Sequence, residues 1–185
     1  MAAFTVIDHQ ELGVSEWAPS GNATVTSWTK SSIPDTYDHL MLKVSARSDS
    51  SATYGGEVRV TLNGDTGSNY SGTILWAYQS IVQSTRASSA AYMNYSYVSN
   101  ASQAANTFGS ATYWIPHYSN TANFKQMISS SAAEDTSSTD LDWIVAVEAG
   151  LWQDTSAVDQ ITLTAGAADD FVQYSTFTLY GIKGA

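Results

Sequence analysis

The chain ends in Tyr174-Ser175-Thr176-Phe177-Thr178-Leu179-Tyr180-Gly181-Ile182-Lys183-Gly184-Ala185, where bulky and small side chains alternate. Because successive side chains of a β-strand point to opposite faces of a sheet, this period of two predicts a strand with one buried face. The alternation stops within a few residues of a glycine. We therefore expect the end of the chain to complete a sheet rather than to form a tail.

The same alternation recurs upstream. Leu40, Leu42, Val44 and Ala46 alternate with other residues along one predicted strand, and residues 57–62 alternate in the same way. Further predicted strands are residues 4–12, 23–28, 70–78, 92–98, 111–116, 124–130, 143–152, 160–164 and 173–180, with glycine, asparagine and aspartate between them as turn signals. No window keeps a 3.6-residue apolar period over three turns, and the best helical segment, residues 87–91, is short.

About eleven strands joined by loops of varied length predict an all-β protein, a two-sheet antiparallel β-sandwich with jelly-roll-like connectivity. The 185 residues show neither a break in composition nor an internal repeat, so we expect residues 1–185 to form a single sandwich domain. A chain of this length buries roughly 70% of its unfolded surface. The absence of cysteine excludes disulfides, thiolate chemistry and cysteine-ligated metals.

The charge balance argues against two classes of partner. Seven lysines and arginines stand against seventeen acidic residues, for a formal charge of −10. Nucleic-acid binding needs cations that displace counterions from phosphates, and anionic lipid surfaces attract basic segments, so we expect neither partner.

Charged residues make up only 13% of the chain, which leaves solubility to Ser, Thr and Asn and suits an extracellular protein or a part of an assembly. Residues 1–8 lack the basic and apolar regions of a secretory signal, so release by host-cell lysis is one expected route.

Aromatic residues are numerous, with six Trp, eleven Tyr and five Phe. One reading is a platform on which sugar rings stack, and the other is a sandwich core or subunit contact, which we favour. Trp17 lies in the irregular stretch Glu16-Trp17-Ala18-Pro19-Ser20, where a strand core is less accessible. We predict Trp17 as an anchor at a protein interface, where Trp is enriched.

Several acidic stretches are candidate metal sites. Asn63-Gly64-Asp65-Thr66-Gly67-Ser68-Asn69 places oxygen ligands at alternate positions like a loose calcium loop, but it lacks the closing glutamate of an EF-hand. A glycine-bearing hairpin turn is the favoured interpretation. Glu134-Asp135 with Asp140 and Asp142 is interpreted as a solvated acidic loop, and Asp169-Asp170 as a turn. The sequence therefore predicts no metal and no other cofactor.

Catalysis finds little support in the residue pattern. His9, His39 and His117 are isolated in the sequence, and no Gly-X-Ser-X-Gly elbow or phosphate loop occurs. A glycosidase needs two carboxylates facing each other, and only Glu57 and Glu148 lie in predicted strands. Glu57 alternates outward and Glu148 lies in an apolar run, so a glycosidase is disfavoured. We expect no catalytic residue and no enzyme.

A resemblance to a known family runs through most of the chain. It is carried by Ser31-Ser32-Ile33-Pro34-Asp35-Thr36-Tyr37-Asp38-His39-Leu40, by residues 62–71 and 105–109, by Ile115-Pro116-His117-Tyr118, and by residues 149–152, 161–164 and 174–182. In this order the segments resemble a family of small virion structural proteins of tailed bacteriophages, often marine or cyanobacterial. The resemblance implies a phage particle component and carries no catalytic residues. Residues 1–28 depart most from the pattern, which makes them a candidate partner-contacting segment.

Two virion roles fit this resemblance. One is a capsid decoration (cement) protein that clamps the major capsid protein, and the other is a receptor-binding or carbohydrate-binding part of a head or tail fibre. The sequence has no coiled-coil heptads and no collagen-like or β-helical shaft, which favours decoration. On that reading the protein is made in the host cytoplasm and lies on the capsid surface. We further expect a homo-oligomer, a trimer on the pattern of decoration proteins at local symmetry axes.

Overall fold

The computed structural model describes residues 3–13, 24–52, 55–78, 80–136, 143–166 and 168–184. Within these ranges the chain forms strands and no helix, so no helix there is long and apolar enough to cross a membrane. The strands are β1 (Ala3–Glu11), β2 (Ser27–Lys30), β3 (His39–Ala46), β4 (Gly56–Leu62), β5 (Tyr70–Tyr78), β6 (Ile81–Ala90), β7 (Met93–Val98), β8 (Gly109–Pro116), β9 (Lys125–Ala133), β10 (Ile144–Trp152), β11 (Ile161–Ala165) and β12 (Thr176–Lys183).

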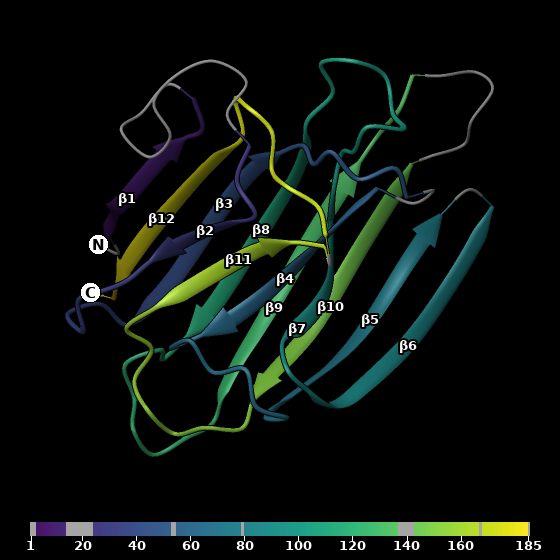
Figure 1. Ribbon diagram of the computed structural model, residues 1–185. Helices are drawn as coiled ribbons and strands as arrows, with labels where there is room; N and C mark the ends of the chain where they lie inside the picture. The colour runs from purple at the N-terminus through teal and green to yellow at the C-terminus, as the bar shows by residue number, and fades with distance from the viewer. Residues whose placement is uncertain are drawn as a thin grey trace.

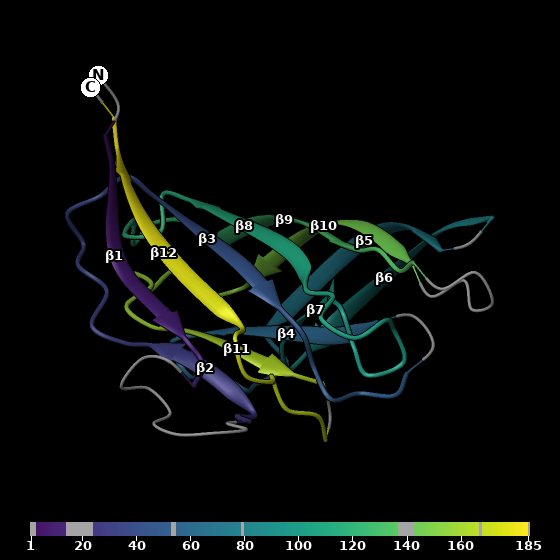
Figure 2. The ribbon, with the colours of Figure 1, turned by 90° about the horizontal axis from the view of Figure 1, so that it is seen from above.

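The strands form two antiparallel sheets packed face to face (Figure 1). The large sheet has eight strands in the order β1-β12-β3-β8-β9-β10-β5-β6, and the small sheet has four in the order β2-β11-β4-β7. Seen from above, the small sheet covers one face of the large one (Figure 2). The predicted all-β sandwich is confirmed.

The connectivity of eight of the strands is that of a jelly roll. Taken in chain order, β1, β2, β3, β4, β7, β8, β11 and β12 pair first with last: β1 with β12, β2 with β11, β3 with β8 and β4 with β7. This is the pattern of an antiparallel ribbon folded double and rolled into two sheets. The remaining strands are two insertions, β5–β6 after β4 and β9–β10 after β8, and both extend the large sheet beyond β8. We call the eight paired strands the jelly-roll half and β9, β10, β5 and β6 the wing.

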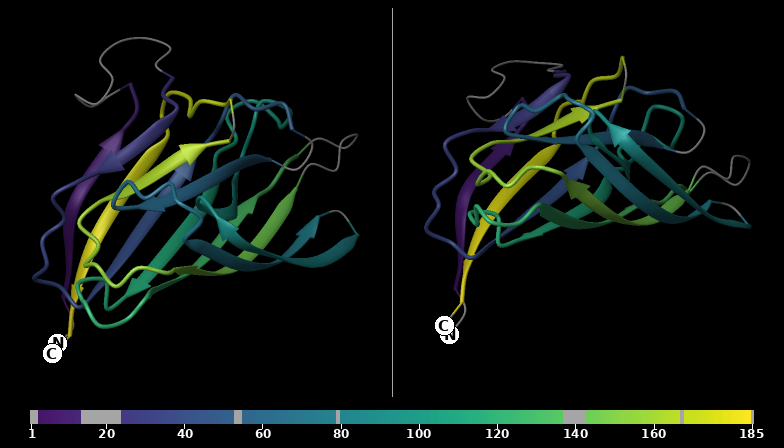
Figure 3. Two further views of the ribbon diagram at one scale, coloured as in Figure 1. Left: turned by 60° about the horizontal axis from the view of Figure 1, so that its bottom comes forward. Right: turned by 90° about the horizontal axis from the view of Figure 1, so that it is seen from below.

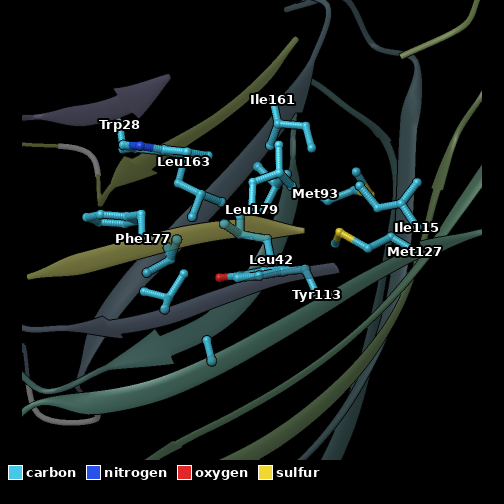
Figure 4. Packing of buried hydrophobic residues seen from close by; sticks show 14 of the residues in the cluster. Trp28, Leu42, Met93, Tyr113, Ile115, Met127, Ile161, Leu163, Phe177 and Leu179 are labelled. Carbon is cyan, nitrogen blue, oxygen red and sulfur yellow. The ribbon is translucent and has the colours of Figure 1, made fainter. Parts of the chain in front are cut away.

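The hydrophobic core lies mainly between the sheets of the jelly-roll half (Figure 4). The inward residues of β3, β8 and β12 meet those of β4 and β11, as the alternating burial of each strand requires. Trp28 stacks on Phe177 with ring centroids 5.5 Å apart, and Phe177 meets Phe171 edge to face at 5.1 Å. Ile74, Tyr78 and Ile144 in the wing are also buried but lie outside this cluster.

Three sequence predictions need correction. The structure has twelve strands in its described residues, because β6 (Ile81–Ala90) was not predicted and takes in most of the segment rated best for a helix, residues 87–91. Both faces of β6 are exposed, so it carries no apolar alternation to detect. The strand expected at 23–28 is β2, which begins only at Ser27. The last strand begins at Thr176 rather than 173, because Tyr174 has a positive φ of 72° in the turn before it.

The described part of the N-terminal segment belongs to the sandwich. β1 pairs with β12 from Ala3 opposite Lys183 to Glu11 opposite Thr176, and Trp28 is buried. The predicted anchor Trp17 lies outside the described residues, as do Asp140 and Asp142 of the acidic loop. The partner-contacting role of residues 1–28 therefore stays a prediction that depends on the stretch around Trp17.

Candidate functional site: the apolar face of the wing

The exposed large apolar side chains gather on the inserted strands. Six of the ten that the described residues contain lie on β5, β6, β9 and β10: Leu75, Ile81, Val82, Ile128, Val145 and Val147. Their side chains are between 43% and 71% exposed. The jelly-roll half needs none of them for its own pairing. An apolar surface on added strands is therefore a candidate for function rather than for folding.

Strand register brings five of these residues onto one surface. On β10, Val145 and Val147 point away from the small sheet, because Ile144, Ala146 and Glu148 point into the sandwich. Val147 lies opposite Leu75 of β5, and Val145 lies opposite Ala77, which is in turn opposite Val82 of β6.

On the other side of β10, Ala149 lies opposite Ile128 of β9. We call the surface made by Leu75, Val82, Ile128, Val145 and Val147 the apolar wing face. A shallow depression of about 160 Å³ lies within it, bordered by β5, β6 and β10.

Charge is nearly absent from the wing. Its four strands contain only Arg86, Lys125 and Glu148 as charged residues, although the chain carries −10 overall. Glu148 is 1% exposed and points into the sandwich, and Lys125 is 2% exposed, with its ammonium donating to the carbonyls of Asn123 and Thr155. Burial lowers the pKa of Lys125, while Asp154 opposes this shift. Arg86 is thus the one exposed charge of these strands, and no exposed carboxylate interrupts the apolar wing face.

The inner face of the wing meets the small sheet through polar groups. The hydroxyl of Ser96 on β7 donates to that of Ser129 on β9 at 3.1 Å, and the backbone N–H of Tyr97 donates to the Ser131 hydroxyl at 3.1 Å. Tyr113 is buried beside them, and its burial, with the nearby Glu148 carboxylate, raises its pKa. Gly150 lets β7 approach, since a Cβ there would meet the Met93 sulfur at 2.6 Å. The wing is therefore fixed to the small sheet along one specific seam.

A pocket opens where the wing extends beyond the small sheet. It has a volume of about 220 Å³, and its walls combine Trp76 and Tyr78 of β5, Ile81 and Gln83 of β6, Tyr97 of β7 and Ile144 of β10. Figure 1 shows β5 and β6 reaching past β7 on this side. Three aromatic rings and one amide are a combination that can bind a small ligand with both an apolar and a polar side.

Residues 63–69 begin with a turn, as favoured from the sequence, but the predicted hairpin is wrong, because β4 before the loop and β5 after it lie in different sheets. Asn63 and Gly64 both have positive φ, 53° and 67°, and the Asp65 N–H donates to the Leu62 carbonyl at 3.0 Å, which is a type I′ geometry. The Asp65 carboxylate accepts the Trp152 indole N–H at 2.7 Å, the Asn69 amide at 2.9 Å and the Gly67 backbone N–H at 2.8 Å. These bonds, that of Trp152 foremost, lower the pKa of Asp65. The carboxylate thus organises the turn where the chain passes from the small sheet into the wing.

The histidines are less isolated than the sequence indicated. His39 begins β3 and His117 follows β8, and their rings lie 5.0 Å apart with the His39 ring also 5.0 Å from Trp114. The His117 backbone N–H donates to Nδ1 of His39 at 3.2 Å. Their neighbourhood follows from the pairing of β3 with β8, which no local spacing reveals. Among the residues that the structure describes, no three His, Asp or Glu side chains are grouped as a metal site would require.

The two strand-borne glutamates do not share a cleft. Glu57 lies on the outer side of the small sheet and accepts from Arg59 Nε at 3.1 Å, whereas Glu148 points from the large sheet into the interior. A pair of carboxylates on opposite sides of one sugar therefore does not form from these residues.

The apolar wing face itself was missed at the sequence level, although one signal for it was present. Residues 144–147 are apolar without alternation, which predicts a strand that is covered on both faces. The structure covers only one face of β10. Comparison of the chain with family models, with curated proteins and with solved structures finds no match.

Proposed function

We propose that this protein is a structural protein of a bacteriophage virion, a capsid decoration protein that attaches through its apolar wing face. The observation that carries the proposal is the concentration of exposed apolar residues on strands that the jelly roll does not require. The sequence resemblance to phage virion proteins supports a place in the virion, and the apolar wing face offers a surface for attachment to the shell. The expected partner is the major capsid protein.

The physical role follows from area and repetition. A wide, shallow, nearly uncharged sheet face suits a wide contact with another folded protein better than it suits a small ligand. Many copies on a shell would each add a modest buried area across seams between capsid subunits, and together these contacts resist internal pressure. The acidic residues elsewhere on the protein give it a large net negative charge, which keeps it soluble despite the uncharged face.

The test is reconstitution on shells that lack the protein. Purified protein is mixed with such shells, and bound protein is measured after sedimentation for the wild type, for Val147→Ser and for Val6→Ser. Val147 and Val6 are 45% and 55% exposed and point to the same side of the large sheet, but Val6 lies at its opposite edge on β1. We expect Val147→Ser to lose most binding at an unchanged melting temperature and Val6→Ser to retain it. Equal binding by all three proteins, or density for the protein away from the head in an electron-microscopy map of virions, would contradict the proposal.

Carbohydrate binding is the second candidate, and it is favoured by the pocket of about 220 Å³ where the wing extends beyond the small sheet. Trp76, Tyr78 and Tyr97 offer aromatic faces on which a pyranose ring can stack, with the Gln83 amide beside them. Titration with host-surface polysaccharides, followed by Trp fluorescence, tests this function. Saturable binding that Trp76→Ala abolishes while Val147→Ser leaves it intact would support a receptor-binding role in place of decoration.

A further inference from the structure

The edge strand β6 is the least protected element of the fold. It is ten residues long, lies last in the large sheet and has eight residues exposed on its two faces. In the part of the chain that the structure describes, nothing pairs with its outer side. The views of Figure 3 show β6 at the open margin of the sheet. Such an edge presents a row of backbone donors and acceptors to any strand that approaches.

The opposite edge of the same sheet is protected in ways that β6 is not. β1 contains a bulge between Val6 and Asp8 and carries Asp8, whose carboxylate lies 3.6 Å from the Lys30 ammonium. Bulges and charges are common devices that prevent edge-to-edge association. β6 contains no proline, lysine or acid, and the irregularity in its pairing with β5 lies at its far end, beside Tyr70 and Gly72. Its stretch from Ile81 to Ala87 is therefore regular and available.

The near absence of charge and the self-complementarity of the edge point to a second copy of this chain as the occupant. Two molecules of −10 repel each other over most of their surfaces, but the wing strands contribute no exposed carboxylate to such a contact. Antiparallel pairing of a strand with its own copy is self-complementary about a two-fold axis, so one edge suffices for a closed dimer. The large sheet already uses antiparallel pairing throughout.

We propose that β6 pairs antiparallel with β6 of a second copy, joining two large sheets into one continuous sheet with a two-fold axis at its centre. The two apolar wing faces then lie side by side. This inference does not depend on the virion role, because it concerns purified protein in solution. The trimer expected from the sequence stays a separate prediction, and it needs a contact other than this edge.

One charge limits the register of the pairing. Arg86 is the only exposed charge on β6, and like charges directly opposite each other destabilise a strand pair. An axis at Arg86 is therefore disfavoured, whereas an axis at Ser84 sets each Arg86 opposite Val82 of the other copy. In that register the Ser84 side chains of the two copies face each other.

The first experiment measures association by analytical ultracentrifugation for the wild type, Thr85→Lys and Thr5→Lys. Thr85 and Thr5 are both exposed threonines on edge strands, one on β6 and one on β1, so the second variant is a matched control. Each substitution lowers the net negative charge, so a lost dimer cannot come from general repulsion.

We expect a wild-type dimer at about 100 µM, at least a tenfold weaker dimer for Thr85→Lys, and no change for Thr5→Lys. A wild-type protein that stays monomeric, or an oligomer that both variants form equally well, would overturn the proposal.

The second experiment uses the lack of cysteine in the chain. Ser84→Cys introduces a single thiol, and facing residues of an antiparallel pair have Cβ atoms about 5 Å apart, which mild oxidation can bridge with small adjustments. We expect rapid disulfide dimers from Ser84→Cys or from a neighbouring β6 position, and none from Thr5→Cys. Efficient cross-linking at β1 alone, or at neither edge, would show that β6 does not meet its copy.

Discussion

The large sheet joins four strands of the jelly-roll half, β1, β12, β3 and β8, to the four strands of the wing, yet the two sets are covered very differently. β3 and β12 alternate buried and half-exposed or exposed residues, and their inward side chains join the main core. β6 has no buried residue, and β10 exposes Val145 and Val147 although all of its residues except the inward Glu148 are apolar. The first pattern is what folding requires. The second leaves apolar area uncovered, which is the expected property of a surface that meets a partner.

The most direct test of this difference in burial is the same leucine-to-alanine substitution in both regions, beginning with the core. Leu163 lies in β11, one of the two inner strands of the small sheet, and is fully buried. Leu163→Ala removes buried methyl groups and leaves a cavity, so we expect a loss of about 2–5 kcal/mol in the free energy of unfolding. Urea denaturation at pH 7 measures it. A loss under about 1 kcal/mol would mean that this part of the core is far less tightly packed than its burial indicates.

The sequence predicted the jelly-roll half better than the wing, for a physical reason. Strands such as β4 have one face on the core and one toward solvent, so their side chains alternate and the strand can be recognised. β5 was predicted with its bounds, Tyr70–Tyr78, but β6 carries Ser, Thr and Ala on both exposed faces and gives no such signal.

The site escaped prediction for a different reason. Whether the second face of an apolar strand such as β10 is covered depends on which strands lie above it. Likewise, the approach of His39 and His117 depends on the pairing of β3 with β8. Both features depend on how distant segments of the chain pair and pack, which the local periodicity of a sequence does not predict.

The junction between the two regions gives an effect of intermediate size. Asp65→Asn keeps the shape of the side chain but weakens its bonds from Trp152, Asn69 and Gly67. Because the site is partly exposed to solvent, we expect a loss of about 1 kcal/mol at pH 7. Since the pKa of Asp65 is lowered in the folded protein, its carboxylate stabilises the fold above the unfolded pKa of about 3.9, and this contribution disappears as the pH falls through the folded value.

The wild type and Asp65→Asn should therefore differ in urea denaturation at pH 7 and converge in acid. Asp35→Asn, at an exposed position, is the control and should follow the wild type at both pH values. A difference for Asp65→Asn that is as large in acid as at neutral pH would show that the lost stability comes from packing of the turn and not from the carboxylate.

The smallest expected effect is the same leucine substitution in the wing. Leu75 is 57% exposed and lies opposite Val147 on the apolar wing face. Leu75→Ala removes only a partly solvated cross-strand contact, so the free energy of unfolding of the isolated monomer should change by about 0.5 kcal/mol or less. Both variants are measured by urea titration at low protein concentration. Because Leu75→Ala and Leu163→Ala are the same chemical change, the difference between their losses in the free energy of unfolding reports the burial of the two side chains. A loss near that of Leu163→Ala would mean that the wing face is already covered in the dilute protein, and an uncovered binding surface there would have to be abandoned.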